Sequence, residues 1–286
     1  MKILVLGGSG MLGKYTTSYL SKKKYQVWST TRKNLDAANI SKEELKEKIK
    51  VLDDNWGNEE KPDLIINCIG MIKPSMAKKP LTEGIKVNAL FPHMVCEICK
   101  EENIKFIHVT TDCVYTGDLK PAVHGYDEDD KHDAEDDYGL TKFLGEPEDC
   151  TVIRTSIIGE EVNQSRSLIE WVKSQKDGKA NGYLNHYWSG ITCLQFAKIV
   201  ERMIENDHWW IGTKHIHSNT VDKFELVEMI NKSFNLNIEV TPVDGPQYCN
   251  RSLSSNFTDS EKLNPESLEK QIKELANYTD ELYARD

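Results

Sequence analysis

Two residues of complementary chemistry, Tyr138 and Lys142, stand four positions apart in the sequence Tyr-Gly-Leu-Thr-Lys. On a helix this spacing is about one turn, so both side chains lie on the same face. An ammonium group beside a phenol favours the ionised phenol, and we therefore expect Lys142 to lower the pKa of Tyr138. A tyrosine tuned in this way exchanges protons with a substrate near neutral pH.

A hydroxyl that belongs with this pair comes from Thr111, in the sequence Thr-Thr-Asp-Cys-Val-Tyr. Thr111 follows a predicted strand over residues 105–110, and ligands of parallel sheets bind beyond the carboxyl ends of the strands. We expect Thr111 to hydrogen-bond a substrate carbonyl and to share its proton with Tyr138. Asp112, the next residue, is expected to lie in the same substrate site.

A glycine motif occupies the start of the chain, where Gly7, Gly10 and Gly13 are spaced G-x-x-G-x-x-G. It follows a predicted strand over residues 2–6 and leads into a helix that begins at Met11. Glycines at such a turn let the backbone approach a pyrophosphate, and the helix N-terminus supplies N–H groups for the anion. The context makes this a strong indication of dinucleotide binding.

The end of the next strand bears on which dinucleotide is bound. An NAD site usually has an acidic residue here for the ribose 2′-hydroxyl, whereas this chain has Arg32 and Lys33 and no acid before Asp36. The two cations suit a 2′-phosphate, so we expect NADPH rather than NADH; the alternative is that they are ordinary surface cations. Asp53 either accepts a hydrogen bond from the adenine amine or caps a helix.

The elements that must position these residues alternate in type over the first half of the chain. Strand–helix alternation with nearly continuous apolar strands predicts an α/β fold with a doubly wound parallel sheet, the Rossmann architecture. Predicted strands cover residues 2–6, 25–30, 50–52, 63–68, 105–110 and 151–154, and the main helices cover 11–22, 41–48 and 82–101.

The second half of the chain follows a different pattern, because helical stretches dominate at residues 165–176, 192–206 and 221–234. We expect residues 1–155 to form the dinucleotide-binding domain. Residues 156–286 are expected to form mostly a smaller, mainly helical substrate-binding lobe, with some segments returning to the sheet. Ser41 with Glu44, and Thr192 with Gln195, fit helix capping boxes.

Taken together, the motifs resemble those of the extended short-chain dehydrogenase/reductases, and within them the dTDP-4-dehydrorhamnose reductase group. The resemblance rests on the glycine motif, the Thr-Thr-Asp-Cys-Val strand end, the Tyr-x-x-x-Lys pair and the Arg154-Thr155-Ser156 segment. It implies that Tyr138 is the catalytic acid, that Lys142 holds the nicotinamide ribose, and that Thr111 orients the sugar carbonyl. The further cofactor contacts that it implies are Met11, Leu12 and Gly13 at the pyrophosphate, and Ile69 and Gly70 near the second ribose.

The reaction implied by this resemblance is NADPH-dependent reduction of the 4-keto group of a nucleotide-linked 4-keto-6-deoxy sugar. The nucleotide is dTDP or UDP, and the sugar is of rhamnose type or N-acetylated. The dehydratases of the superfamily carry Asp-Glu after the catalytic Thr, and the absence of this Glu argues against dehydration.

Cys113 adds a second activity to what the resemblance implies. It stands where related epimerising reductases carry a catalytic cysteine, and His186 is a candidate for the partner acid. The two residues would give 3,5-epimerisation in the same site. The alternative is that Cys113 packs as a small apolar residue and His186 only hydrogen-bonds the sugar.

The substrate lobe offers two further candidates. Arg251 is expected to bind the diphosphate of the sugar nucleotide, and Trp188 to stack on the sugar or the base. Each is equally compatible with a purely structural role.

Two other functions fit the same motifs. One is a nucleotide-sugar 4-epimerase with tightly held NAD, which Arg32 disfavours. The other is a non-catalytic NADP-binding regulatory subunit of the kind that resembles this reductase group, which the intact Thr111, Tyr138 and Lys142 disfavour.

Composition excludes other classes of protein. The 286 residues include 46 acidic against 36 basic side chains, a net charge of −10, which argues against a basic nucleic-acid surface. No targeting or membrane segment is evident, and the odd number of cysteines, seven, suggests a reducing, cytoplasmic compartment.

We expect no metal site, since Cys96 and Cys99 fit a buried helix face. Residues 127–137, eight of them acidic, are expected to form a solvated loop. A homodimer is a family-level expectation.

Overall fold

The computed structural model divides the chain into two compact units, each built from separate segments of sequence. The first unit contains residues 1–114, 132–154 and 207–214, and the second contains 115–131, 155–206 and 215–286. The structure describes residues 1–50, 61–119, 125–161, 167–257, 263 and 265–283. For residues 279–283 it describes the backbone only.

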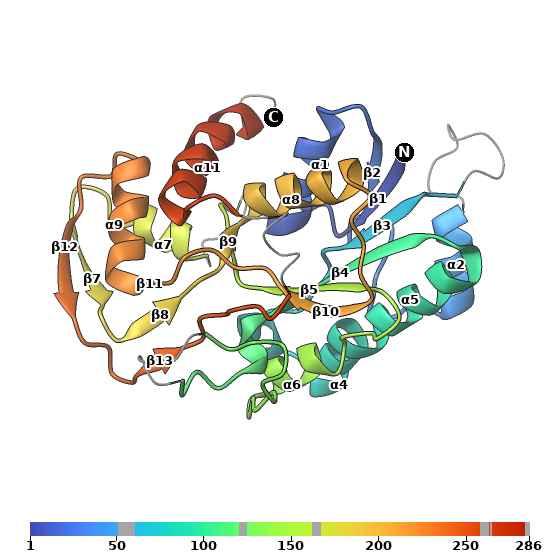
Figure 1. The fold of residues 1–286 in the computed structure, drawn as a ribbon, viewed down its shortest axis with the longest axis horizontal. Helices are drawn as coiled ribbons and strands as arrows, with labels where there is room; N and C mark the ends of the chain where they lie inside the picture. Colours follow the sequence, from blue (N-terminus) through green and yellow to red (C-terminus); the bar gives the residue numbers. More distant parts are fainter. Residues whose placement is uncertain (51–60, 120–124, 162–166, 258–262, 264, 284–286) are drawn as a thin grey trace. The chain divides into compact units, whose positions relative to one another are not determined.

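The first unit is built on a six-stranded sheet with the order β10-β5-β4-β3-β1-β2 (Figure 1). The pairs β1–β2, β1–β3 and β3–β4 are parallel, as the sequence predicted for a doubly wound sheet. The strands are β1 (Lys2–Leu6), β2 (Gln26–Ser29), β3 (Leu64–Asn67), β4 (Lys105–Thr111), β5 (Thr151–Thr155) and β10 (Gly212–His215).

The strand order creates one switch point, between β1 and β3. The chain runs from β1 outward to β2 and then returns to place β3 on the other side of β1. In doubly wound sheets the crevice at the carboxyl ends of two such strands is where ligands bind. The glycine turn after β1 and the segment with Ile69 and Gly70 after β3 both lie at this point.

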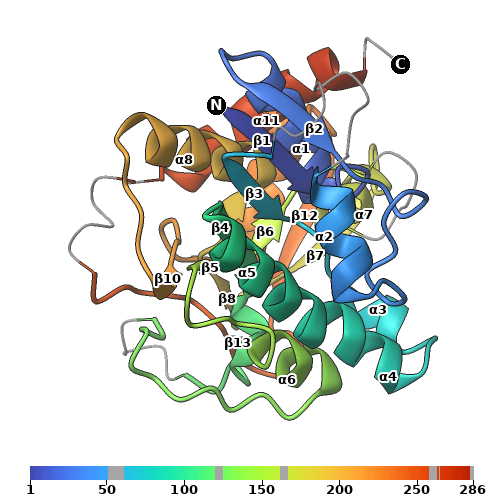
Figure 2. The same ribbon diagram turned by 90° about the vertical axis from the view of Figure 1, so that its right-hand side faces the viewer.

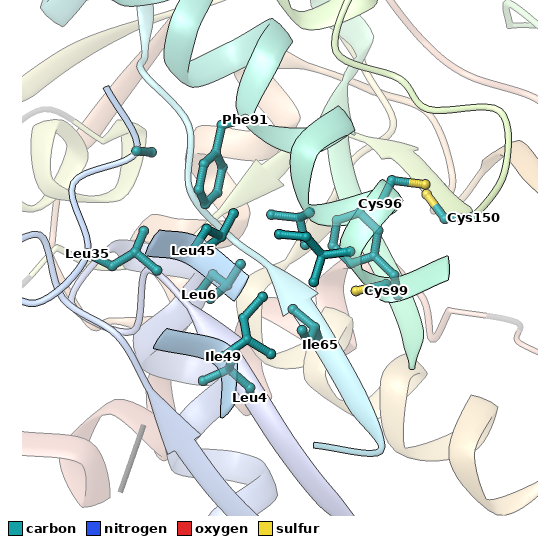
Figure 3. Close-up of a cluster of buried hydrophobic side chains, with 14 of the residues drawn as sticks. Leu4, Leu6, Leu35, Leu45, Ile49, Ile65, Phe91, Cys96, Cys99 and Cys150 are labelled. Carbon is teal, nitrogen blue, oxygen red and sulfur yellow. The ribbon is translucent and has the colours of Figure 1, made fainter. Parts of the chain in front are cut away.

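Helices α2 and α5 cover one face of this sheet and lie beside one another (Figure 2). Their apolar side chains meet Leu4, Leu6 and Ile65 in one buried cluster (Figure 3). The helical elements of the unit are α1 (Met11–Ser21), α2 (Lys42–Lys50), α3 (Lys73–Met76), α4 (Leu81–Gly84), the π-helix η2 (Ile85–Leu90), α5 (Phe91–Glu102), the 3₁₀ turn η3 (Asp112–Val114) and α6 (Asp137–Phe143).

The start of α2 confirms a predicted cap, and its end corrects a predicted strand. The Ser41 hydroxyl accepts from the Glu44 N–H, and the Glu44 carboxylate accepts from the Ser41 N–H, both at 3.1 Å. Lys50, expected to begin a strand, is instead the last residue of α2. The rest of that predicted strand, residues 51–52, lies outside the described residues.

The second unit contains the three predicted helices, together with strands that the sequence analysis did not anticipate. Its sheets have the orders β11-β8-β13, β12-β7 and β6-β9. Its helices are α7 (Leu168–Lys173), α8 (Cys193–Glu205), α9 (Lys223–Ser233) and the unpredicted α11 (Leu268–Tyr283). The strands are β6 (Ile157–Ile158), β7 (Lys179–Tyr183), β8 (His186–Trp188), β9 (Ile191–Thr192), β11 (Val221–Asp222), β12 (Glu239–Val243) and β13 (Cys249–Asn250). These strands have two to five residues, too few for a clear alternating pattern.

The predicted capping box at the start of α8 forms only in part. The Thr192 hydroxyl accepts from the Gln195 N–H at 3.1 Å, as expected. The Thr192 N–H, however, donates to the Gln271 side chain of α11 at 3.0 Å, in place of Gln195. Both polar atoms of the buried Gln195 amide lack a hydrogen-bond partner among the described residues. A residue 76 positions further along the chain (271 − 195) thus replaces the local partner.

These two glutamines should respond in opposite ways to substitution. We expect Gln271→Ala to lower the free energy of unfolding by about 1–3 kcal/mol, because it leaves the buried Thr192 N–H without an acceptor. We expect Gln195→Leu, the matched control, to leave stability unchanged or to raise it, because an unpaired buried amide is replaced by an apolar group. Urea denaturation of both variants measures the difference, and equal losses would contradict this account.

Candidate active site

Thr111 and Tyr138 meet at the carboxyl end of β4. Thr111 is the last residue of the strand and is 8% exposed. Tyr138 lies in the first turn of α6, and its side chain hydrogen-bonds that of Thr111. Asp136 caps this helix by accepting from the Gly139 N–H at 2.9 Å. The cap fixes where α6 begins, and therefore where Tyr138 points.

Gly139 allows α6 to approach the strand end closely. A Cβ atom at this position would lie 2.3 Å from the Cys113 carbonyl oxygen and 2.5 Å from the Ala134 Cβ. Real Cβ atoms do not come so near, so any other residue would push the helix away from η3. The glycine inside the Tyr-Gly-Leu-Thr-Lys sequence is thus what brings Tyr138 within reach of Thr111.

Lys142 lies one turn beyond Tyr138 and is almost fully buried, with 5% exposure. Its ammonium donates to the Val109 carbonyl oxygen of β4 at 2.9 Å. Burial lowers the pKa of Lys142 to about 8, and the negative charge of Glu146 opposes this shift. Lys142 is therefore held against the same strand end as Tyr138, in a dry environment.

The pKa of Tyr138 moves in the direction opposite to the one that we expected. Burial raises it above its usual value, and the nearby Cys113, Asp112 and Asp136 raise it further. The hydrogen bond with Thr111 acts the other way but is the weaker effect. The prediction that this pKa is lowered was wrong: desolvation of the phenol is the largest effect, and Lys142 is not among the groups that shift it. Tyr138 therefore keeps its proton at neutral pH, which is the form that a proton donor needs.

Asp112 and Cys113 form the short η3 turn directly after Thr111. The Thr111 hydroxyl donates to the Asp112 carboxylate at 3.1 Å, and the Cys113 N–H donates to the same hydroxyl at 3.2 Å. Asp112 is buried, with 5% exposure. Both residues lie beside Thr111, and together they hold its hydroxyl in place.

The glycine turn has the geometry of an anion site. Gly7 adopts a φ of +85°, which other residues rarely reach. A Cβ on Gly13 would lie 2.2 Å from the Gly7 carbonyl oxygen, so only glycine lets α1 pack on the turn. Gly10 is the N-cap of α1 and provides no capping side chain. The N–H groups of the first turn, at Met11 and Leu12, can therefore serve a phosphate.

The predicted cofactor segments lie close together and reach Lys142. A Cβ on Gly7 would come within 2.9 Å of the Ile69 side chain, so the ends of β1 and β3 are in contact. The Cβ position of Gly70 is 3.9 Å from the Lys142 ammonium. A dinucleotide with its pyrophosphate at α1 and its second ribose beside Gly70 and Lys142 fits this arrangement.

Arg32 is exposed but already paired. Its guanidinium lies 3.2 Å from the Glu83 carboxylate and 3.9 Å from that of Asp36, with 66% of the side chain exposed. An exposed arginine in this position remains accessible to a phosphate, which would compete with the two carboxylates. Asp53, the predicted adenine contact, lies outside the described residues.

Asn88 is a site residue that the sequence analysis missed. Its buried amide accepts from the Met71 N–H at 2.7 Å and donates to the Met71 carbonyl at 2.9 Å and to the Thr141 hydroxyl at 3.3 Å. It thereby joins the segment after Gly70 to α6. Asn88 belongs to the π-helix η2, an irregularity frequent at functional sites. The sequence did contain a signal for Asn88, because it is a polar residue within the apolar stripe of the predicted helix.

In the second unit, two predicted substrate contacts have structural roles. The Arg251 guanidinium donates to the carbonyl oxygens of Tyr115 at 2.7 Å and Thr116 at 2.8 Å, which argues against the predicted diphosphate contact. Trp188 is 5% exposed, and a Cβ on Gly190 would lie 2.2 Å from its ring. This ring is buried against backbone, which argues against stacking on a sugar or base.

His186 lines a pocket of about 620 Å³ in the second unit. Its Nε2 hydrogen-bonds the Gln247 carbonyl at 2.6 Å, so this nitrogen is the donor and carries the hydrogen. The pocket combines aromatic rings, amides and two lysines, a lining that suits a planar polar ring and an anion. It is formed by Leu168, Trp171, Gln175, Lys179, Ala180, Asn181, Tyr183, His186, Lys223 and Val227.

The acidic segment 127–137 is more than the solvated loop that we expected. The half-buried Glu128 accepts from the His215 N–H at 2.7 Å, the Ser255 hydroxyl at 2.7 Å and the Asn256 N–H at 2.8 Å. Its carboxylate thus connects three segments of the second unit. Asp136 caps α6 and pairs with Lys73 at 2.7 Å. Two of the acids therefore stabilise the structure.

Two kinds of feature are absent from the part of the chain that the structure describes. No group of three or more His, Cys, Asp or Glu side chains there is arranged to hold a metal ion. No helix there combines the length and apolar character needed to cross a membrane.

The fold and the Thr–Tyr–Lys arrangement place the chain among the extended short-chain dehydrogenase/reductases, with a Rossmann-type sheet. Residues 1–280 match the RmlD substrate binding domain, and the chain belongs to that family.

Curated relatives are similar over about half of the chain. SpsK, a spore coat polysaccharide biosynthesis protein of Bacillus subtilis, is 26% identical over 161 residues, which cover 54% of this chain and 52% of SpsK. A dTDP-4-keto-6-deoxy-D-glucose reductase of Streptomyces niveus is 26% identical over 160 residues, which cover 54% of this chain and 51% of that protein. The aligned part thus spans about half the length of each relative.

A solved structure extends the likeness of the fold to nearly the whole chain. The dTDP-4-dehydrorhamnose reductase of Bacillus anthracis, in complex with NADP, superposes with a TM-score of 0.78 at 20% identity. The superposition covers 97% of this chain and 99% of that one.

The lowered pKa of Lys142 can be measured in the protein without any ligand. We expect the Lys142 amine to titrate near pH 8, well below a free lysine, because its ammonium is desolvated. NMR of protein with ¹³C-labelled lysine follows the titration, and the signal absent in Lys142→Arg identifies it. Because the folded state then binds fewer protons than the unfolded state between about pH 8 and 10.5, Lys142 should make stability rise with pH there. A Lys142 signal that titrates near 10.5 would contradict the burial.

Proposed function

We propose that this protein reduces the 4-keto group of a nucleotide-linked 4-keto-6-deoxy sugar with NADPH, as a step in deoxysugar biosynthesis. The observation that carries the proposal is the hydrogen-bonded Thr111 and Tyr138 beside the buried Lys142, at the same sheet edge as Gly70. Membership of the RmlD family and the likeness to reductases named for such sugars support it.

The cofactor supplies a hydride to the carbonyl carbon, and the protein supplies position and a proton. In the proposed reaction Thr111 hydrogen-bonds the carbonyl oxygen of the sugar. Tyr138 donates its proton to that oxygen as negative charge develops on it. Lys142, anchored to the Val109 carbonyl, binds the cofactor ribose and stabilises the phenolate that remains. The raised pKa of free Tyr138 suits this role, because the tyrosine enters the reaction protonated.

The preference for NADPH rests on Arg32. In the proposal its exposed guanidinium exchanges Asp36 and Glu83 for the 2′-phosphate of the cofactor. The structural neighbour crystallised with NADP supports this choice. The nucleotide-diphospho-sugar is the second ligand, and the dTDP and UDP forms are both candidates. The expected homodimer and cytoplasmic location stay predictions.

The direct test is NADPH oxidation with a panel of enzymatically made 4-keto-6-deoxy sugar nucleotides. We expect turnover with at least one of them. We expect Tyr138→Phe to reduce kcat by roughly 10²–10⁴-fold, because the proton donor is lost while the ring remains. Calorimetry should show that the variant still binds NADPH with a similar affinity.

The outcomes of that assay separate the alternatives. NADPH binding without turnover on any sugar of the panel would favour a non-catalytic regulatory subunit. Conversion at C4 without net NADPH consumption would favour a 4-epimerase. Leu140→Ala is a matched control, because Leu140 lies on the same helix with 40% exposure, and it should retain activity.

Arg32 should determine the choice between the two nicotinamide cofactors. We expect Arg32→Ala to weaken NADPH binding at least tenfold and to leave NADH binding nearly unchanged, because only NADPH carries the 2′-phosphate. Titration of each cofactor by intrinsic fluorescence measures both constants. Lys33→Ala tests the neighbouring cation in the same way. An equal loss for NADH and NADPH would show that Arg32 supports the fold and does not recognise the phosphate.

A second candidate activity, 3,5-epimerisation, is favoured by one observation. Cys113 lies in the site, where its backbone N–H donates to the Thr111 hydroxyl at 3.2 Å. A thiolate there could remove a proton beside the ketone before reduction. We expect the wild type to incorporate deuterium from D₂O at C3 and C5, and Cys113→Ser to reduce without exchange. Normal reduction without exchange in the wild type would rule out this activity, and with it the proposed acid role of His186.

A further inference from the structure

Cys96 and Cys150 form a pair of thiols that the proposed reaction does not use. Cys96 lies in α5, and Cys150 immediately precedes β5. Their sulfur atoms are turned toward each other and interact (Figure 3), and the Cys150 thiol also donates to the Pro147 carbonyl oxygen at 3.9 Å. Cys99, one turn along α5, has its sulfur turned away from this pair (Figure 3). Both Cys96 and Cys150 are reduced.

The pair is buried but lies just below the surface of the first unit. Cys96 is 6% exposed and Cys150 is 5% exposed. Their neighbours Lys100 and Asp149 form an ion pair of 2.5 Å with 69% and 61% of the two side chains exposed. An ion pair so exposed is weak and opens readily. Since neither cysteine is completely buried, we expect a small oxidant to reach the thiols from this side.

The surroundings give the two thiols different reactivity. The contact with Cys150 lowers the pKa of Cys96 and is the largest effect. Burial and the charges of Asp149 and Glu97 oppose it, and the Lys100 charge adds to it. The same contact and burial raise the pKa of Cys150. Since the thiolate is the reactive form, Cys96 is the attacking residue of the pair and Cys150 is the resolving residue.

We propose that Cys96 and Cys150 are a redox modification site, at which a hydroperoxide converts the two thiols into a reversible disulfide. The Cys96 thiolate attacks the peroxide oxygen, the O–O bond breaks, and the leaving oxygen takes a proton to become water or an alcohol. Cys96 becomes a sulfenic acid. The Cys150 sulfur then attacks the Cys96 sulfur, and the sulfenic oxygen leaves as a second water. Two thiols are oxidised, and one peroxide is reduced.

The disulfide would close a loop that contains the candidate active site. Between positions 96 and 150 lie β4 with Thr111, and α6 with Tyr138 and Lys142. The cross-link ties α5 to the start of β5 and restricts the unfolded chain. The oxidised protein should therefore have a higher midpoint of thermal unfolding than the reduced protein.

The test is disulfide mapping on the full-length wild type, treated with a small excess of hydrogen peroxide and then blocked with N-ethylmaleimide. We expect mass spectrometry to find the peptide of Cys96 joined to that of Cys150, and dithiothreitol to reverse the link. The thermal midpoint should rise on oxidation and return on reduction. Blocked Cys96 and Cys150 thiols, with oxidation confined to the less buried Cys68, Cys113 or Cys249, would overturn the proposal.

Two variants test the assigned roles. In Cys150→Ser we expect a sulfenic acid at Cys96 that dimedone traps, because the resolving thiol is gone. Cys99→Ser is the matched control, since Cys99 is buried in the same helix, and it should still form the Cys96–Cys150 link. A link between Cys96 and Cys99 in the wild type, or loss of the link in Cys99→Ser, would contradict the assignment. Circular dichroism verifies that each variant is folded.

Discussion

The close approach of α6 to the end of β4 is the constraint on which the candidate site depends. It is possible only because Gly139 has no side chain to strike the Cys113 carbonyl. From that contact follow the hydrogen bond between Tyr138 and Thr111 and the anchoring of Lys142 on Val109. Asn88, in the π-helix η2, extends the same alignment to the segment after β3 by binding both Met71 and Thr141. One helix position thus sets the positions of Tyr138, Lys142 and the segment after β3 together.

The dryness of this strand end explains the protonation states of its two ionisable residues. Desolvation disfavours the charged form of each group, so it raises the pKa of Tyr138 and lowers that of Lys142 to about 8. A protonated phenol beside an amine that still carries its proton at neutral pH is well suited to donating a proton to an oxyanion. Burial, which the Tyr-x-x-x-Lys spacing does not reveal, therefore keeps Tyr138 protonated, the form that the proposed acid role requires.

Several charged side chains of this acidic protein stabilise its structure. Backbone N–H groups at the glycine turn are available to bind an anion. Glu128 binds two other segments of the second unit, at His215 and at Ser255 and Asn256, and Arg251 binds two carbonyl oxygens, so neither is reserved for a ligand. A net charge of −10 opposes anionic ligands at long range. At short range, hydrogen bonds from the N–H groups of the glycine turn and the dipole of α1 outweigh this long-range repulsion. The buried thiols Cys96 and Cys150 both lie in the first unit.

Local patterns in the sequence determined strands β1 to β5, the glycine turn and the Tyr138–Lys142 spacing, because strand burial, positive φ and helical spacing depend on near neighbours. The edge strand β10 was not predicted. Thr111 and Gly70 were also predictable, since the carboxyl ends of parallel strands share one edge. Tertiary structure decided what depends on distant partners. It replaced Gln195 with Gln271 at the Thr192 cap, assigned Arg251 to backbone carbonyls, buried Trp188, and paired short strands too brief to show a pattern. It also reversed the expected pKa shift of Tyr138, because desolvation is a property of the packed site and not of the residues in order.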